Sequence, residues 1–198
     1  MALAERLRAR LADGHAPRPS FRELAAAAGV GVATLRHYFG DRDRLVRDVL
    51  ELHAPAAARH LAFLRTPQAP FAASITAVAA YVALGLRQPV VDELHLAGLS
   101  EGLGRPVQGA AYLTQVLEPM IEAVEARLAA HMAGGEMRPA DPRQAALSLL
   151  APVILAHLHQ AALGGCDTRP LAQDRFLQDH CEGFVRAYAA ALQDPAAR

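Results

Sequence analysis

The sequence predicts an all-α protein, with an N-terminal three-helix domain that contains a helix-turn-helix and a larger C-terminal helical domain. Three observations favour this class: apolar residues recur at helical spacing, no segment alternates as a β-strand does, and Gly and Pro separate the apolar stretches. About nine helices are expected, near residues 2–13, 20–28, 32–39, 41–64, 68–86, 89–101, 106–133, 142–163 and 171–192. The two domains are placed at residues 1–50 and 51–198, with the boundary in the long fourth helix close to Pro55.

Each expected helix has an apolar stripe or a stop signal that defines it. The first helix carries Leu3, Leu7 and Leu11 on one face and ends at the Gly and Pro residues of 14–19. Two later helices carry longer stripes, which are Leu113, Val116, Leu117, Met120, Val124 and Leu128, and Leu147, Leu150, Ile154 and Leu158. Pro119 and Pro152 fall inside these two helices, and each should kink its helix or mark a local break, because proline cannot donate the backbone hydrogen bond.

The composition narrows the class of protein. Hydrophobic residues make up 53% of the 198 residues, which allows a sizeable core and argues against disorder. No apolar run approaches the roughly 18 to 20 residues of a membrane span. The N-terminus, MALAERLRARL, is charged throughout, unlike a signal peptide. With only two cysteines, Cys166 and Cys181, neither a disulfide framework nor a cysteine-rich metal site is expected. A cytoplasmic protein without a membrane segment is predicted.

The net charge is zero, but the charge is unevenly distributed. Residues 1–50 carry nine Arg and six acidic residues, and residues 51–198 carry eleven Arg and fourteen acidic residues. The first segment therefore has a charge of +3 and the second a charge of −3. A mildly basic head on an acidic body is typical of a small DNA-binding domain joined to a second domain.

Residues 20–40 contain the signals of two short helices joined by a tight turn. Ser20 and Glu23 form an S-x-x-E capping box that begins the first helix. Leu24, Ala25 and Ala28 can face a core, and Gly29 lies where a helix end favours a left-handed residue. A second helix follows at once, from residue 32 to 39. This spacing is that of a helix-turn-helix, whose second helix enters the major groove of DNA.

The second helix has an inner and an outer face. Leu35 and Phe39 are four residues apart and should point back to the core. That arrangement leaves four side chains for the groove, which are Val32, Ala33, Arg36 and His37. Gly40 should end this helix, and Asp41 should cap the next one.

About thirty residues in this segment resemble, in order, the DNA-binding motif of the TetR family. The matching stretches are Glu23-Leu24-Ala25, Ala28-Gly29-Val30, Thr34-Leu35, His37-Tyr38-Phe39, and Asp41-Arg42 through Leu45. The resemblance implies a homodimer that binds palindromic double-stranded operator DNA, and it implies that Thr34, Tyr38 and Arg42 hold phosphates. The predicted DNA-binding set is Ser20, Arg22, Val32, Ala33, Thr34, Arg36, His37, Tyr38 and Arg42.

The segment departs from the family pattern in three places. Arg36 stands where the family usually has Tyr, and an Arg can pair with guanine O6 and N7. Arg42 replaces the usual Lys. The first helix has no long basic arm, so no reach into the minor groove is expected.

The resemblance also implies a small-molecule pocket and a dimer interface in the C-terminal domain. The pocket is expected among the fifth to eighth helices, with Tyr81, His95, Leu99, Tyr112, Val116, Met120 and His157 as candidate lining residues. The dimer interface is expected on the last two helices, with Leu147, Leu150, Ile154, Leu158, Phe176, Leu177 and Phe184 as candidates. No cofactor and no metal site are predicted, since His157 and His159 are two residues apart and point to different helix faces.

These features predict a ligand-responsive transcriptional regulator, a repressor that a small apolar or amphipathic molecule releases from its operator. The alternative is a helical ligand-binding or adaptor protein that does not bind DNA. An enzyme is the weaker alternative, because no nucleophile elbow, Ser-His-Asp arrangement or paired-carboxylate motif is present in the sequence.

Overall fold

The computed structural model describes residues 2–13, 18–51 and 54–190, and these residues form helices and no β-strand. The helices are α1 (Ala2–Ala12), α2 (Phe21–Ala28), α3 (Val32–Phe39), α4 (Arg42–Glu51), α5 (Ala54–Arg65), α6 (Phe71–Leu86), α7 (Pro89–Gly102), α8 (Pro106–Tyr112), α9 (Glu118–Ala133), α10 (Pro142–His157), α11 (Gly165–Thr168) and α12 (Gln173–Tyr188). Two π-helical segments, η1 (Leu113–Leu117) and η2 (Leu158–Ala162), continue α8 and α10. The all-α prediction is confirmed.

The two prolines inside the long helices have different effects. Helix α8 continues through η1 into α9, and the π turn lies directly before Pro119, where the N–H of Glu118 bonds to the carbonyl of Leu113. Since Pro119 has no N–H to give to the preceding turn, a wider turn at this point is expected. Pro152, in contrast, lies within the continuous helix α10. The expected fourth helix comprises α4 and α5, and residues 52–53 between them lie outside the described residues.

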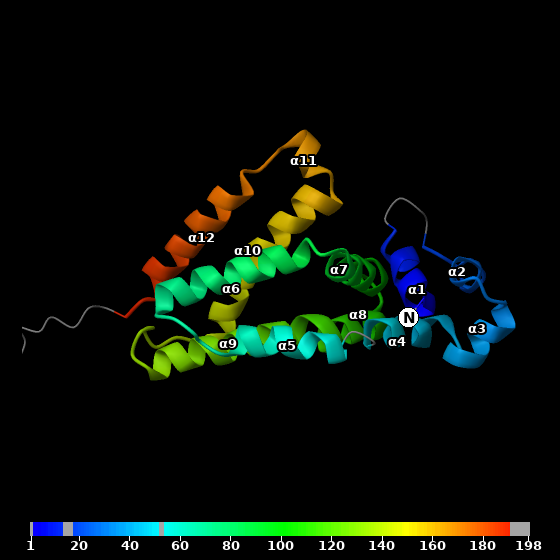
Figure 1. Cartoon of the computed structure of the whole chain (residues 1–198), viewed down its shortest axis with the longest axis horizontal. Helices are drawn as coiled ribbons and strands as arrows, with labels where there is room; N and C mark the ends of the chain where they lie inside the picture. Colours follow the sequence, from blue (N-terminus) through cyan, green and yellow to red (C-terminus); the bar gives the residue numbers. More distant parts are fainter. Residues whose placement is uncertain (1, 14–17, 52–53, 191–198) are drawn as a thin grey trace, which may run out of the picture. The chain divides into compact units, whose positions relative to one another are not determined.

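The chain forms two compact units (Figure 1). Unit 1 comprises Met1–Arg59 and Leu86–Pro119, and unit 2 comprises His60–Gly85 and Met120–Arg198. In unit 1, helix α1 packs along α7, and α4 packs against α8. The core of unit 1 contains Leu7, Leu11, Leu24, Ala25, Ala28, Leu35, Leu45, Val46, Val49, Leu50, Leu94, Ala97 and Tyr112. The first four helices therefore share one core with α7 and α8.

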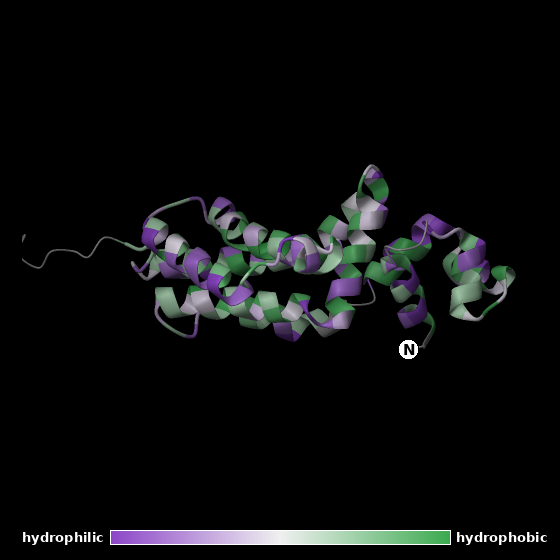
Figure 2. Ribbon diagram, turned by 90° about the horizontal axis from the view of Figure 1, so that it is seen from above, coloured by the Kyte–Doolittle hydropathy of each residue, from purple (hydrophilic) through white to green (hydrophobic). Residues whose placement is uncertain are grey.

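Unit 2 is built around α6, α9, α10 and α12. Its fully buried side chains include Ile75, Leu128 and Leu149 from three different helices. The end of α12 is fixed to the loop after α9 by an isolated antiparallel bridge between Met137 and Ala189. Figure 2 shows hydrophilic and hydrophobic residues alternating along most of the helices.

The continuous helix Pro142–Ala162, which comprises α10 and η2, is long and apolar enough to cross a membrane. The expectation that no segment approaches a membrane span therefore does not hold for this helix. The finding is weak evidence for a span, because core helices of soluble proteins have the same length and composition. One face of this helix is buried through Ala145, Leu149 and Val153, while Leu155 is exposed on another.

Candidate nucleic-acid interface

Helix α2 begins with the capping box that the sequence predicted. The Ser20 hydroxyl accepts the N–H of Glu23 at 3.3 Å, and the Glu23 carboxylate accepts the N–H of Ser20 at 2.7 Å. The hydrogen bond from the Ser20 backbone is the main reason that the pKa of Glu23 is lowered. Two of the free N–H groups at the helix start are satisfied in this way, which fixes the first turn. Leu24, Ala25 and Ala28 are buried, as expected.

The turn between α2 and α3 depends on a glycine. Gly29 has φ +73°, the left-handed conformation that side chains with a Cβ adopt only with strain. Its N–H bonds back to Ala26 at 3.0 Å, and the N–H of Val30 bonds to Ala25 at 3.0 Å. Helix α3 then begins after Gly31, whose carbonyl accepts the N–H of Leu35. The backbone hydrogen bonds of Gly29 and Val30 therefore close the end of α2 at the turn.

Helix α3 has one anchored face and one open face. Leu35 is fully buried and Phe39 is half-buried against the core of unit 1, which are the two inward positions that the sequence predicted. The other six side chains of the helix are exposed, including Tyr38 at 64%. These six are Val32, Ala33, Thr34, Arg36, His37 and Tyr38. Ser20 and Arg22, at the start of α2, are exposed as well.

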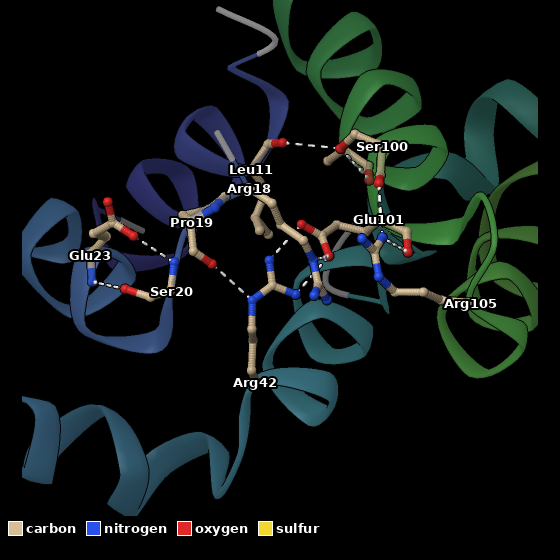
Figure 3. A network of polar contacts seen from close by, with 10 residues as sticks. Leu11, Arg18, Pro19, Ser20, Glu23, Arg42, Ser100, Glu101 and Arg105 are labelled. Carbon is tan, nitrogen blue, oxygen red and sulfur yellow. Dashed lines mark hydrogen bonds and ion pairs between the residues drawn. The ribbon is translucent and has the colours of Figure 1, made fainter. Parts of the chain in front are cut away.

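Arg42 differs from the other eight predicted DNA-binding residues, because its guanidinium is already bound within the chain (Figure 3). Nη1 and Nη2 of Arg42 donate to the two carboxylate oxygens of Glu101 on α7, both at 2.6 Å, and Nε donates to the carbonyl of Pro19 at 2.9 Å. Arg18 donates a further hydrogen bond to Glu101 at 2.9 Å. The predicted phosphate contact of Arg42 stays a prediction, and it competes with this contact.

Glu101 is a buried carboxylate, and the arginines keep it ionised. Its side chain is 2% exposed. Burial acts to raise its pKa, but the hydrogen bonds and charges of Arg42 and Arg18 outweigh burial, so that the pKa lies below the usual range. The neighbouring Ser100 hydroxyl donates to the carbonyl of Leu11 at 3.3 Å, which ties the same turn of α7 to α1.

A family model for the AefR-like transcriptional repressor C-terminal domain, one of the TetR C-terminal domains, matches residues 73–191, more than half of the chain. The chain belongs to the TetR family. It is therefore a transcriptional regulator, and members of this family are not enzymes. No curated protein sequence matches the chain.

Solved structures of TetR-family proteins have the same fold over nearly the whole chain. A TetR-family regulator from Pseudomonas syringae pv. tomato has 17% identity and a TM-score of 0.69, with 96% of each chain covered. A candidate TetR-family regulator from Mesorhizobium loti has 17% identity and a TM-score of 0.71, again with 96% of each chain covered. A candidate fatty acid metabolism regulator from Clostridium perfringens has 14% identity and a TM-score of 0.74, with 98% of this chain and 100% of that chain covered. At these sequence identities, the similarity to the solved structures establishes a shared fold only.

The seven candidate pocket residues are divided between the units of this TetR-family chain. In unit 1, the Tyr112 hydroxyl lies 2.7 Å from Nδ1 of His95, and both residues are buried. Burial raises the pKa of Tyr112. Leu99 and Val116 are half-buried and pack against the same core. The other three candidates, which lie in unit 2, are Tyr81, Met120 and His157, and all are half-buried. Tyr81 contacts His60 through its hydroxyl, and its ring lies at a tilt of 33° against that of Phe63.

An open groove of about 560 Å³ in unit 1 is lined by none of these seven residues. It lies between α4 and the α8–η1 segment, and its lining residues are Arg47, Asp48, Glu51, Pro106, Val107, Ala110, Ala111, Thr114 and Gln115. Among the described residues, no three His, Cys, Asp or Glu side chains gather as a metal site would require. Cys166 is exposed and Cys181 is buried, and burial raises the pKa of Cys181.

The candidate dimer residues are partly core and partly surface. Leu150 and Phe184 are buried within unit 2, whereas Leu147 is 42% exposed. The remaining four, Ile154, Leu158, Phe176 and Leu177, are half-buried. Leu155, which is not among the predicted interface residues, is 65% exposed and follows Leu147 by two helical turns. Helix α10 therefore has an apolar face that unit 2 does not cover.

Sequence reasoning missed a buried polar network in unit 2. Arg127 on α9 is 1% exposed and donates to the backbone carbonyls of Phe63 and Leu64 in the last turn of α5, and to the Ser74 hydroxyl at 2.6 Å. His131 bridges Ser74 and Glu136, at 2.8 Å to each. Burial lowers the pKa of Arg127. The C-terminal end of a helix carries a partial negative charge, and the favourable interaction of Arg127 with the end of α5 helps to explain how this cation is tolerated in the core.

Proposed function

We propose that this TetR-family regulator binds palindromic operator DNA through α3, represses transcription, and is released when a small molecule binds. The observation that carries the proposal is the surface of α3, where six of eight side chains are exposed and Leu35 and Phe39 anchor the opposite face. A recognition helix needs both properties, because it must enter the major groove while its other face stays fixed to the domain.

The exposed residues divide into base readers and backbone contacts. Val32, Ala33, Arg36 and His37 are the proposed base readers, since they lie on the open face of α3. Four further residues, Ser20, Arg22, Thr34 and Tyr38, are the proposed contacts to phosphates, and all four are exposed. The excess of +3 within residues 1–50 favours the approach of this surface to DNA.

The proposed regulator is a homodimer that acts in the cytoplasm. Members of the TetR family are dimers, and the exposed Leu147 and Leu155 supply an apolar face on α10 for a second copy. A two-fold dimer presents two copies of α3, which suits a palindrome of two half-sites.

The proposed effector is an apolar or amphipathic molecule. TetR-family regulators bind small-molecule effectors. The Clostridium perfringens protein of like fold is a candidate fatty acid metabolism regulator, which makes long-chain fatty acids the first class to test. A ligand releases DNA only if it binds the DNA-free state more tightly, so DNA must weaken ligand binding by the same factor.

Selection of duplexes from a random-sequence DNA library with the purified protein tests the proposal. Enrichment of a palindrome supports it, and Arg36→Ala should weaken binding to that palindrome. Arg65→Ala is the matched control, because Arg65 is also an exposed arginine in the last turn of a helix but lies outside the motif. A selection without any enriched sequence would instead favour the adaptor that does not bind DNA.

The effector is tested separately, by calorimetric titration of palmitate with and without the selected duplex. Weaker palmitate binding in the presence of the duplex supports release by this class of molecule. Equal palmitate affinity in the two titrations would exclude antagonistic release by palmitate.

A further inference from the structure

Both ends of the helix-turn-helix are bound to one carboxylate. Arg18 lies two residues before the N-cap of α2, and Arg42 is the first residue of α4, directly beyond the turn that ends α3. Both side chains donate to Glu101 in the last turn of α7, as Figure 3 shows. Residues 20–40 therefore form a loop of chain whose two flanks meet at the same side chain.

The bonds of Arg42 are of the strongest kind that a side chain makes. Its two parallel hydrogen bonds to Glu101 are bidentate and charge-assisted, and its third bond, from Nε to Pro19, reaches the other flank directly. The Arg42 side chain is 15% exposed and that of Glu101 is 2% exposed. Water therefore competes weakly for this ion pair.

A bidentate phosphate contact by Arg42 would require this pair to open, because Nη1 and Nη2 both donate to Glu101 and Nε donates to Pro19. The buried carboxylate of Glu101 would then keep only the single bond from Arg18, whose side chain is 39% exposed. Removing one partner of a buried ion pair is strongly unfavourable, because it leaves a charge in the interior without compensation. A single phosphate contact, made in solvent, returns much less free energy.

We propose that Glu101 is the positioning residue of the DNA-binding motif. It acts in a clasp with Arg18 and Arg42, in which Arg42 binds Glu101 and does not act as a phosphate ligand. The clasp of Arg18, Arg42 and Glu101 fixes α2 and α3 on α7 before DNA arrives. DNA binding then does not have to order the motif, which lowers the cost of association. This inference deepens the proposed function and rests on it.

The test uses the full-length protein and the duplex selected by the wild type. Operator affinity and its salt dependence are measured for Glu101→Gln, Arg42→Gln and the double variant. Glutamine is nearly isosteric with glutamate and removes its charge; at position 42 it removes the guanidinium and its charge but is shorter than arginine. Arg18→Gln perturbs the exposed member alone and is the milder variant if the buried changes prevent folding. Glu93→Gln is the matched control, because Glu93 also pairs α7 with an arginine, Arg8 of α1, at 2.7 Å, outside the motif.

The clasp predicts that Glu101→Gln and Arg42→Gln each weaken operator binding by about tenfold, and that the double variant is no weaker than either alone. The salt slope should stay that of the wild type, because no phosphate contact is lost. Arg18→Gln should weaken binding by about threefold, and Glu93→Gln by less than about twofold. Amide hydrogen exchange of residues 20–40 should speed up in Glu101→Gln and not in Glu93→Gln.

The phosphate role of Arg42 predicts a different pattern. Arg42→Gln would then lower the salt slope by about one charge per half-site, and Glu101→Gln would bind DNA as tightly as the wild type or more tightly. Either result overturns the clasp. If the wild type selects no duplex at all, the proposed function fails, whereas the hydrogen-exchange comparison still tests whether Glu101 holds the motif.

Discussion

Replacing Gly98 with alanine should destabilise the protein, although alanine is the better helix former. Gly98 lies in α7 directly under the ring of Tyr112 from α8. A Cβ at this position would lie 2.1 Å from Cδ2 and 2.5 Å from Cε2 of that ring. The ring would have to retreat by about 1.3 Å to reach an ordinary 3.4 Å contact.

Three features oppose that retreat. Tyr112 is 4% exposed, and its hydroxyl is held 2.7 Å from His95. Helices α7 and α8 also touch at a pair of glycines, where a Cβ on Gly102 would lie 3.1 Å from the Cα of Gly109. The overlap should cost about 1–3 kcal/mol, and loss of the buried hydrogen bond about 1 kcal/mol more. The gain in helix propensity, about 1 kcal/mol, offsets only part of this.

Urea unfolding at a fixed protein concentration measures the effect. We expect Gly98→Ala to lower the free energy of unfolding by about 1–3 kcal/mol. Gly85→Ala is the control, because Gly85 lies in helix α6 with no atom within 4 Å of the new Cβ, and it should be neutral or stabilising. Gly98→Ala combined with Tyr112→Leu should recover part of the loss. If Gly98→Ala is as stable as Gly85→Ala, the packing argument is wrong.

Four further predictions address the interface, the core and the clasp. Light scattering at micromolar concentration should give a molecular mass of about twice the 21.1 kDa of one chain, and the Leu155→Glu variant should have the mass of a single chain. A monomer mass for the wild type would contradict the dimer. The Arg36→Ala variant should no longer distinguish one G·C pair in each half-site from other base pairs, which corresponds to a loss of about 1–3 kcal/mol in binding discrimination. If the variant selects the same sequence as the wild type, Arg36 does not read a base. Arg127→Met should lower the free energy of unfolding by about 3 kcal/mol, because the carbonyls at the end of α5 lose their donor; unfolding like that of the wild type would show that water replaces it. Since the pKa of Glu101 is lowered on folding, its contribution to stability is present above about pH 4.5 and is lost as pH falls through its folded pKa, so acid should narrow the stability difference between the wild type and Glu101→Gln; a constant difference would count against it.

The helix-turn-helix was predictable from the sequence because its signals are local. The capping box, the left-handed Gly29 and the inward pair Leu35 and Phe39 each depend on residues within four positions of one another. Local hydrogen bonds and helical periodicity suffice to place such features. The exposed face of α3 follows from the same periodicity, because Leu35 and Phe39 turn toward the core and leave the other side chains at the surface.

The contacts of Glu101 could not be read in this way. Its partners Arg18 and Arg42 lie 83 and 59 residues away in the sequence. In the sequence, Glu101 is an ordinary polar residue at the end of a helix, and its burial follows only from the packing of α1 and α4 on α7. The same is true of Arg127, because two of its three acceptors are backbone carbonyls, which leave no residue type to recognise, and the third, Ser74, lies 53 residues away in the sequence.

The packing of unit 1 indicates what holds the DNA-binding motif in place. A boundary at residue 50 separates the motif by function, but the core that anchors Leu35 of α3 also contains Leu94 and Tyr112 from α7 and α8. The flanks of the motif are bound to α7 as well, through Glu101, and α1 is bound to it through Glu93. Helix α7 is thus part of the structural support of the motif, even though it lies in the segment that the family model assigns to the C-terminal domain. Any event that displaces the last turn of α7 must act on both flanks of the motif at once, because both depend on one carboxylate.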